Sequence, residues 1–158
     1  MIDLKIFKEI SIGGLTKDQL LQQLIEAGIQ FNKYANTLFE HPSFFPQDKI
    51  ETVQLVKIKS ADFDLGNSHS YQEIVNQASS LGLSLCPLYL AAFLRLEYLD
   101  QPEEPYLTIA SAKPENDENY PNGFYIRNTD NALWLRGYGG DDYCEWPSGN
   151  EFIFLKSI

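Results

Sequence analysis

The sequence has few cysteines and no long apolar run. Cys86 and Cys144 are its only cysteines, which excludes a disulfide-rich secreted framework, and we expect both thiols to be reduced. No stretch approaches the roughly 18–20 consecutive apolar residues that a membrane-spanning helix needs. Asp3 lies where the apolar run of a signal peptide would build up, so no signal peptide is predicted. These absences favour a cytoplasmic protein that does not enter a membrane.

Basic side chains are also scarce. The chain has 12 Lys and Arg against 22 Asp and Glu, a net charge of −10. An excess of negative charge repels phosphate backbones, and the basic residues are scattered along the chain, so direct nucleic-acid binding is not predicted. The acidity suits solubility, or attraction to a basic protein partner.

No motif in the sequence defines a cofactor or a metal site. The two histidines, His41 and His69, and the two cysteines stand nowhere at the short spacing of a zinc site. We therefore predict no cofactor and no metal ion.

The chain does have enough apolar and aromatic residues for a folded domain that contains β-strands. Of its 158 residues, 44% are hydrophobic and 13% aromatic. The pattern places helices first and then mainly strands, with a pair of helices between, which is typical of an α+β fold and not of repeating βαβ units. We expect one domain over residues 1–158: a mainly antiparallel sheet of about five to seven strands, packed with about three to four short helices.

Helix signals are clearest near the N-terminus. Thr16 and Gln19 form a capping box, and Gly28 supplies a left-handed helix stop. With a second short helix over 32–39, this helix would form a helical-hairpin subdomain over 13–42. The other expected elements are strands over 1–12, 52–58, 94–98, 106–110 and 152–155, and helices from Ser70 to Leu81 and from Pro87 to Phe93. The strands over 94–98 and 106–110 are expected to form a second hairpin.

Residues 123–138 read as a β-hairpin with two different faces. Side chains on a strand alternate between faces, so each arm carries one apolar edge and one edge of aromatic and Arg residues. A loop of either two or four residues within 128–131, where Asn and Asp tolerate left-handed backbone, preserves both faces. One face carries Phe124, Ile126, Leu133 and Leu135, and the other carries Tyr125, Arg127, Trp134 and Arg136.

The face with aromatic and Arg residues is the strongest candidate for a binding site. Tyr, Trp and Arg anchor protein interfaces because they bury much area and still form hydrogen bonds. This pattern favours a small non-catalytic binding or regulatory module that docks a protein partner. Such a face could also stack a sugar or a base, or it could lie beneath a helix with Arg over Trp as a local cation–π pair. The hypothetical binding residues are Tyr125, Arg127, Trp134, Arg136 and Tyr138.

Two other functions fit the sequence. A small hydrolase or transferase would use His69 or Cys86 with Asp141 and Asp142, since a helix start after Cys86 would lower its thiol pKa. The alternative is that Cys86 is a buried apolar residue in a Leu-rich run and that the Asp pair belongs to a turn. An acidic inhibitor that imitates nucleic-acid charge would instead need one surface lined by carboxylates. Those carboxylates are Glu97, Asp100, Glu103, Glu104, Glu115, Asp117 and Glu118.

Three short runs, over 81–87, 94–102 and 132–136, carry a resemblance to known sequences. They read Leu-Gly-Leu-Ser-Leu-Cys-Pro, Leu-Arg-Leu-Glu-Tyr-Leu-Asp-Gln-Pro and Ala-Leu-Trp-Leu-Arg. In these runs the chain resembles a family of small uncharacterised bacterial proteins, some of them labelled helicase. The resemblance implies no established activity. The chain also lacks the phosphate loop and the basic strand-tracking groove that an NTP-driven motor needs.

Overall fold

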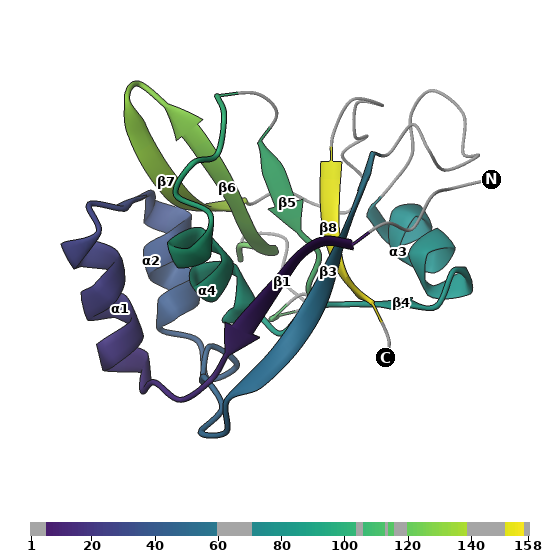
Figure 1. The fold of residues 1–158 in the computed structure, drawn as a ribbon, viewed down its shortest axis with the longest axis horizontal. Coiled ribbons are helices and arrows are strands. Elements are labelled where there is room, and N and C mark those ends of the chain that lie inside the picture. The colour runs from purple at the N-terminus through teal and green to yellow at the C-terminus, as the bar shows by residue number, and fades with distance from the viewer. Residues whose placement is uncertain are drawn as a thin grey trace.

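The computed structural model describes residues 6–59, 71–103, 106–112, 114–115, 120–138 and 151–156. Within these ranges four helices pack with an eight-stranded, mixed and mostly antiparallel sheet, which confirms the α+β class with slightly more strands than expected (Figure 1). The elements are β1 (Ile6–Ile12), α1 (Lys17–Glu26), β2 (Gln30–Phe31), α2 (Lys33–Phe39), β3 (Glu51–Lys59), α3 (Tyr71–Ser80), β4 (Leu83–Ser84), α4 (Leu90–Glu97), β5 (Leu107–Ile109), β6 (Gly123–Thr129), β7 (Ala132–Tyr138) and β8 (Glu151–Lys156).

The strands are ordered β1-β3-β8-β5-β6-β7-β2, and β4 adds a short pairing to β8. Two pairs are parallel, β5 with β8 and β2 with β7, and the other pairs are antiparallel. β3 and β8 lie inside the sheet, and both bury apolar side chains on its two faces. This position explains the apolar runs from which both strands were predicted, because a strand covered on both faces has no solvent side.

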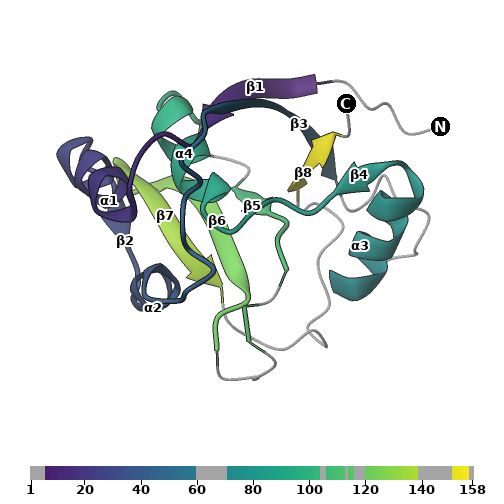
Figure 2. The same ribbon diagram turned by 90° about the horizontal axis from the view of Figure 1, so that it is seen from below.

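Helices cover the two faces of the sheet unequally. α1, α2 and α4 pack on one face, where Leu20, Leu38 and Leu94 share a core with Phe124 and Leu135 of the β6–β7 hairpin. α3 lies on the other side of the sheet (Figure 2). Its apolar residues pack with side chains of β3, β4 and β8, and this smaller core contains Ile74, Ala78, Val56, Ile58, Leu83, Ala110, Phe152 and Phe154.

The local signals of the N-terminal helices have their expected geometry. The Thr16 side chain accepts the Gln19 backbone N–H at 3.1 Å, and the Gln19 side chain accepts the Thr16 N–H at 2.9 Å. Gly28 has φ 78° after the end of α1, as a left-handed stop requires. Asn32 caps α2, whose bounds agree with the prediction. Residues of α1 and α2 lie in the same hydrophobic core as residues of the sheet, so these helices pack directly on the sheet.

The hairpin closes with a turn of two residues. Asp130 and Asn131 have φ values of 55° and 60°, the left-handed backbone that a type I′ turn needs at both central positions. Thr129 therefore pairs with Ala132, and the register places Tyr125 opposite Arg136 and Arg127 opposite Trp134.

The predicted strand over 94–98 and its hairpin with 106–110 are wrong. Residues 94–97 belong to α4, and β5 pairs instead with β6 and β8. The expected helix over 87–93 starts later, because Pro87 opens a turn in which its carbonyl accepts the Leu90 N–H at 3.0 Å. Every residue from Leu90 to Arg95 is buried, so α4 has no solvent face in this stretch to produce a helical period.

Candidate binding site

The hairpin presents its aromatic and Arg side chains on the same face of the sheet as α3. Thr108 of β5 pairs with both Phe152 of β8 and Tyr125 of β6, and residues paired across strands share a face. Phe152 lies in the α3 core, so Tyr125 points to that side. The helices that contact the hairpin, α2 and α4, lie on the opposite face.

Rings and guanidinium groups form a continuous row of contacts across this surface. The Arg127 guanidinium carbon lies 5.8 Å from the centre of the Tyr106 ring, which is 5.3 Å from the Tyr125 ring. Arg136 lies 5.9 Å from Tyr125 and 4.9 Å from Trp134, and its Nε donates to the Tyr125 hydroxyl at 2.7 Å. The Arg–Trp cation–π pair, which the sequence suggested only for a face beneath a helix, is present, although α2 and α4 lie on the opposite face. We call the surface formed by Tyr106, Tyr125, Arg127, Trp134, Arg136 and Tyr138 the aromatic–arginine face.

Side chains of this face are half-buried, Trp134 included. The Trp134 indole Nε1 is buried, with no hydrogen-bond partner among the described residues. The remaining exposed area of these rings is available to a partner.

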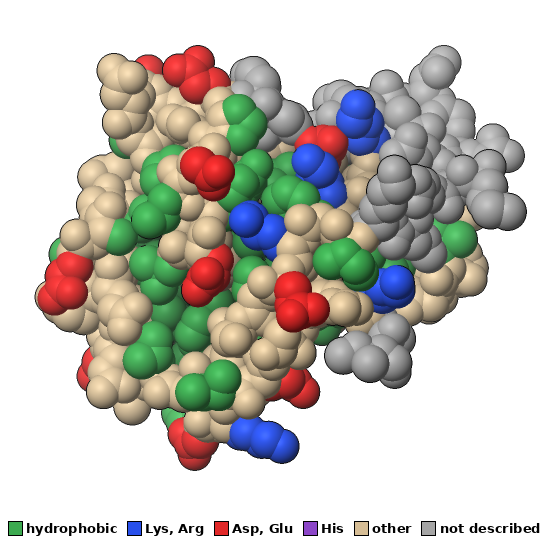
Figure 3. All heavy atoms as spheres, viewed as in Figure 1, with side chains coloured by type: hydrophobic (Ala, Val, Ile, Leu, Met, Phe, Trp, Pro, Cys, Tyr) green, Lys and Arg blue, Asp and Glu red, His purple; other side chains and the backbone are tan. Residues whose placement is uncertain are grey.

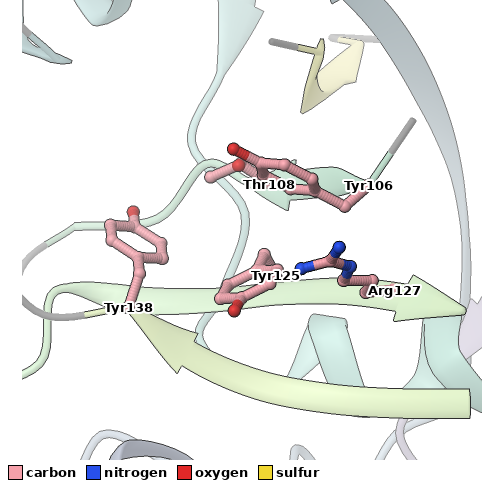
Figure 4. A pocket seen from close by; sticks show the side chains of 5 residues that line it. All are labelled: Tyr106, Thr108, Tyr125, Arg127 and Tyr138. Atoms are coloured by element: carbon pink, nitrogen blue, oxygen red, sulfur yellow. The ribbon is translucent and has the colours of Figure 1, made fainter. Parts of the chain in front are cut away.

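Two residues that sequence patterns did not indicate complete the site: Tyr106, which directly precedes β5, and Thr108 of β5. They stand beside Tyr125, Arg127 and Tyr138 around a pocket of about 210 Å³ (Figure 4). Thr108 is 1% exposed. The side chains of Tyr106 and Thr108 lie above the β6 strand and face those of Tyr125 and Arg127, so the pocket exists only because β5 pairs with β6.

Gly123 allows Tyr138 to form one end of the pocket. A Cβ on Gly123 would lie 2.8 Å from the Ser111 Oγ and 3.1 Å from the Tyr138 hydroxyl. Both distances are shorter than ordinary contacts, so any side chain at this position would displace Tyr138. The absence of a side chain on β6 thus lets a ring from the paired position on β7 lie across the strand.

Arg95 fixes the backbone of the hairpin from the helical side. Its side chain is fully buried, and its guanidinium donates to the Gln101 Oε1 at 2.6 Å and to the Trp134 carbonyl at 3.3 Å. It also reaches the carbonyls of Arg127, at 3.5 Å, and Tyr98. Burial lowers the pKa of Arg95 to about 10, so the group is charged at neutral pH. It thereby holds the two backbone segments that carry Arg127 and Trp134.

The face is locally cationic on an acidic protein. Among the described residues, neither Arg127 nor Arg136 forms an ion pair with a carboxylate. No described acceptor binds the Arg127 guanidinium, which lies beside the Tyr106 ring in a cation–π contact. Its five N–H donors can therefore meet an acceptor from a ligand.

Cys86 does not have the environment of a nucleophile. It is 4% exposed, and its Sγ lies 3.7 Å from the Ile153 carbonyl oxygen. Burial raises the thiol pKa well above its ordinary value, whereas an attacking cysteine needs a lowered one. His69, Asp141 and Asp142, the other residues of the enzyme hypothesis, lie outside the described residues, as does Cys144.

His41 forms a cluster that sequence patterns did not indicate. Its Nε2 lies 2.7 Å from Glu115 Oε1, and its Nδ1 lies 2.7 Å from the Ser43 Oγ. The Nδ1 also accepts the Ser43 backbone N–H at 3.0 Å. The single lone pair of this nitrogen is thus already engaged, and both Ser43 and Glu115 are exposed. The cluster consequently fits a surface tie between two loops better than a Ser–His–Glu catalytic group.

The acidic-inhibitor hypothesis has limited structural support. Of its seven carboxylates, Glu104, Asp117 and Glu118 lie outside the described residues. Glu115 is engaged with His41. On the face drawn in Figure 3, acidic side chains are dispersed among other residue types and do not gather into one patch.

Two further kinds of site do not occur among the described residues. No group of three or more His, Cys, Asp or Glu side chains there could hold a metal ion. No helix in the same ranges is long and apolar enough to cross a membrane.

Comparison of the chain with protein-family models, curated proteins and solved structures gives no match.

Proposed function

We propose that this protein is a small, cytoplasmic, non-catalytic binding module that docks a partner protein through its aromatic–arginine face. The observation that carries this proposal is the continuous row of contacts among rings and guanidinium groups from Arg127 to Trp134, on a part of the sheet whose contacting helices lie on the other side. Tyr, Trp and Arg are the residue types that supply most binding energy in protein interfaces.

The face is suited to binding because its side chains are already ordered. Arg136 is held by its hydrogen bond to Tyr125 and by stacking on Trp134. Arg127 is held over Tyr106. Immobilising a long side chain on association costs roughly 0.5–1.5 kcal/mol, and stacked guanidinium groups avoid part of that cost.

Pocket size favours a protein partner over a cofactor-sized ligand. Small-molecule sites usually enclose about 300–1,000 Å³, whereas the pocket at Tyr106 and Arg127 has about 210 Å³. The face also continues beyond the pocket to Arg136 and Trp134, which do not line it. A surface that continues past one small recess is typical of a protein interface whose anchor side chain enters the recess.

The test is a pull-down from native lysate with the full chain as bait. Wild type is compared with the double variant Arg127→Ala/Arg136→Ala and with the control Lys33→Ala/Lys49→Ala, which removes the same charge at two exposed positions. Each captured protein is then purified, and its Kd for the three baits is measured by calorimetry. We expect at least one partner that binds wild type and the control equally and the double variant at least tenfold more weakly.

Two results would contradict the proposal. The first is that every captured partner binds the double variant as tightly as wild type. The second is that no specific partner is captured by a bait whose near-UV circular dichroism shows a native fold.

A further inference from the structure

We propose that the pocket between β5 and β6 receives one carboxylate side chain, Asp or Glu, from the partner protein. The inference rests on the proposed function and names the chemical group that its site recognises. The recognising group is the Arg127 guanidinium, flanked by the rings of Tyr106 and Tyr125.

Arg127 is arranged for a planar anion. Its guanidinium carbon lies 5.8 Å from the centre of the Tyr106 ring, and no described acceptor occupies its N–H edge, which can therefore meet a ligand. A carboxylate matches this edge, because its two oxygens accept two parallel N–H donors. No described residue supplies a competing carboxylate: the other lining residues are tyrosines and a threonine.

The surroundings strengthen this interaction. Thr108 is 1% exposed, and the rings of Tyr106 and Tyr125 lie beside the guanidinium and form part of the pocket walls (Figure 4). Charge-assisted hydrogen bonds are stronger where such walls exclude part of the water than at an open surface. The same walls can pack against the methylene groups of the incoming side chain.

Volume and charge limit the ligand further. A space of about 210 Å³ corresponds to roughly seven water molecules at about 30 Å³ each, which suits one side chain. Only one guanidinium lines the pocket, and it balances the single charge of a carboxylate. Phosphate groups carry about two charges and are typically bound by clusters of Arg residues.

The net charge of −10 does not oppose this occupant. Exposed charges are screened over about 8 Å at physiological ionic strength, so the groups in contact decide recognition. A partner that is basic overall, as the acidity of the chain suggests, needs only one carboxylate at the centre of its interface. Arg136, which lies beyond the pocket, offers a second cation to a neighbouring acidic residue.

Random 12-residue peptides displayed on phage and selected on the full wild-type chain provide the test. The best peptide is synthesised as selected, and also with each Glu replaced by Gln or each Asp replaced by Asn. Its Kd is measured for wild type, for Arg127→Gln and for Arg127→Lys. We expect selected peptides to be enriched in Asp or Glu. Loss of either the peptide carboxylate or the Arg127 charge should weaken binding at least tenfold, and the two losses together should cost little more than one.

Arg127→Lys, which keeps the charge but not the two parallel donors, should give an intermediate Kd. Selection without acidic enrichment, failure to select any peptide, or equal binding to wild type and Arg127→Gln would overturn the inference. The proposed function is tested separately, with the protein that the pull-down captures. If a captured partner requires the aromatic–arginine face but binds Arg127→Gln with an unchanged Kd, the proposed binding module is supported and the carboxylate inference is wrong.

Discussion

The side-chain amide of Asn32 binds both backbone groups of Gly137. Its Oδ1 accepts the Gly137 N–H at 2.9 Å, and its Nδ2 donates to the Gly137 carbonyl at 2.9 Å. The same Oδ1 accepts the Ala35 N–H at 2.9 Å and caps α2. One side chain therefore extends the parallel pairing of β2 with β7 and starts the next helix, which fixes α2 against the back of the hairpin.

Replacement of Asn32 by Ala should destabilise the fold markedly. A lost N-cap costs about 1 kcal/mol, and each lost hydrogen bond to Gly137 costs about 1 kcal/mol more, so we expect a total loss of about 2–4 kcal/mol. Asn32→Asp keeps the accepting oxygen and should cost less. The free energies of unfolding come from urea titrations followed by tryptophan fluorescence. Equal stability of wild type and Asn32→Ala would show that these contacts contribute nothing.

Gly137→Ala should separate α2 from the strand. A Cβ at this position would lie 2.7 Å from the Tyr34 backbone carbon and 2.9 Å from the Ala35 nitrogen. These are backbone atoms of the helix, which no change of rotamer can move. The expected loss is about 1–3 kcal/mol, typical of overpacking. Amide chemical shifts should change along both α2 and β7; shifts confined to residues next to 137 in sequence would contradict the close approach.

The hairpin and its two faces were predictable because their causes are local. Alternation of side chains needs only neighbouring residues, and Asp130–Asn131 specifies the turn without any distant contact. The capping box of α1 is equally local. All five predicted binding residues come from this hairpin, and Tyr125, Arg127 and Tyr138 line the pocket.

The other half of the site depends on contacts between distant segments. Tyr106 and Thr108 reach the pocket only through the pairing of β5 with β6 and β8, and a three-residue strand carries too little pattern to reveal its neighbours. Arg95 falls within the expected strand over 94–98, because the alternating pattern there assigns Arg95 to the solvent side. Its actual position depends on acceptors supplied by residues 98, 101, 127 and 134, none of which a local pattern could indicate.

Arg95→Met should loosen the hairpin. The apolar side chain fills much of the same space, but it leaves the Gln101 Oε1 and the Trp134 carbonyl without their donor. Each buried acceptor left unsatisfied costs about 1–3 kcal/mol, so a loss of at least about 2 kcal/mol is expected. The stability of Arg95→Lys, which supplies fewer donors than Arg, should lie between that of wild type and that of Arg95→Met. Amide hydrogen exchange should accelerate in β6 and β7 more than in β3; a uniform change would argue against a specific role in the hairpin.

Cys86 should resist thiol reagents in the native protein. Burial excludes the reagent and raises the thiol pKa, so little thiolate forms at pH 8. The rate is measured with dithiobis-nitrobenzoate in a Cys144→Ser background, so that Cys86 alone reports. We expect labelling to be at least roughly a hundredfold slower than for the urea-denatured chain. Similar rates in the two states would mean that Cys86 is accessible and would revive the nucleophile hypothesis.

The tyrosine contribution to stability should fall as the pH rises above about 10, the ordinary pKa of tyrosine. Burial raises the pKa values of Tyr89, Tyr98 and Tyr120 in the folded protein. The neutral phenol is therefore favoured by folding, and its contribution is complete below the unfolded pKa and is lost as the pH rises through the folded one. Arg95 acts in the opposite sense, because its pKa is lowered to about 10 from 12.5. The tyrosine contribution is therefore measured with variants that keep Arg95 unchanged.

Tyr98→Phe isolates one of these contributions. The variant keeps the ring contact with Phe7, at 5.4 Å between centroids, and removes only the ionisable hydroxyl, whose pKa is raised first by burial and then by Asp100. Urea midpoints measured from pH 8 to pH 11 should fall less steeply for Tyr98→Phe than for wild type. Tyr34→Phe serves as the control, since Tyr34 is 43% exposed. If the midpoints of Tyr98→Phe follow those of wild type at every pH, ionisation of Tyr98 is not coupled to folding and the alkaline loss must arise elsewhere.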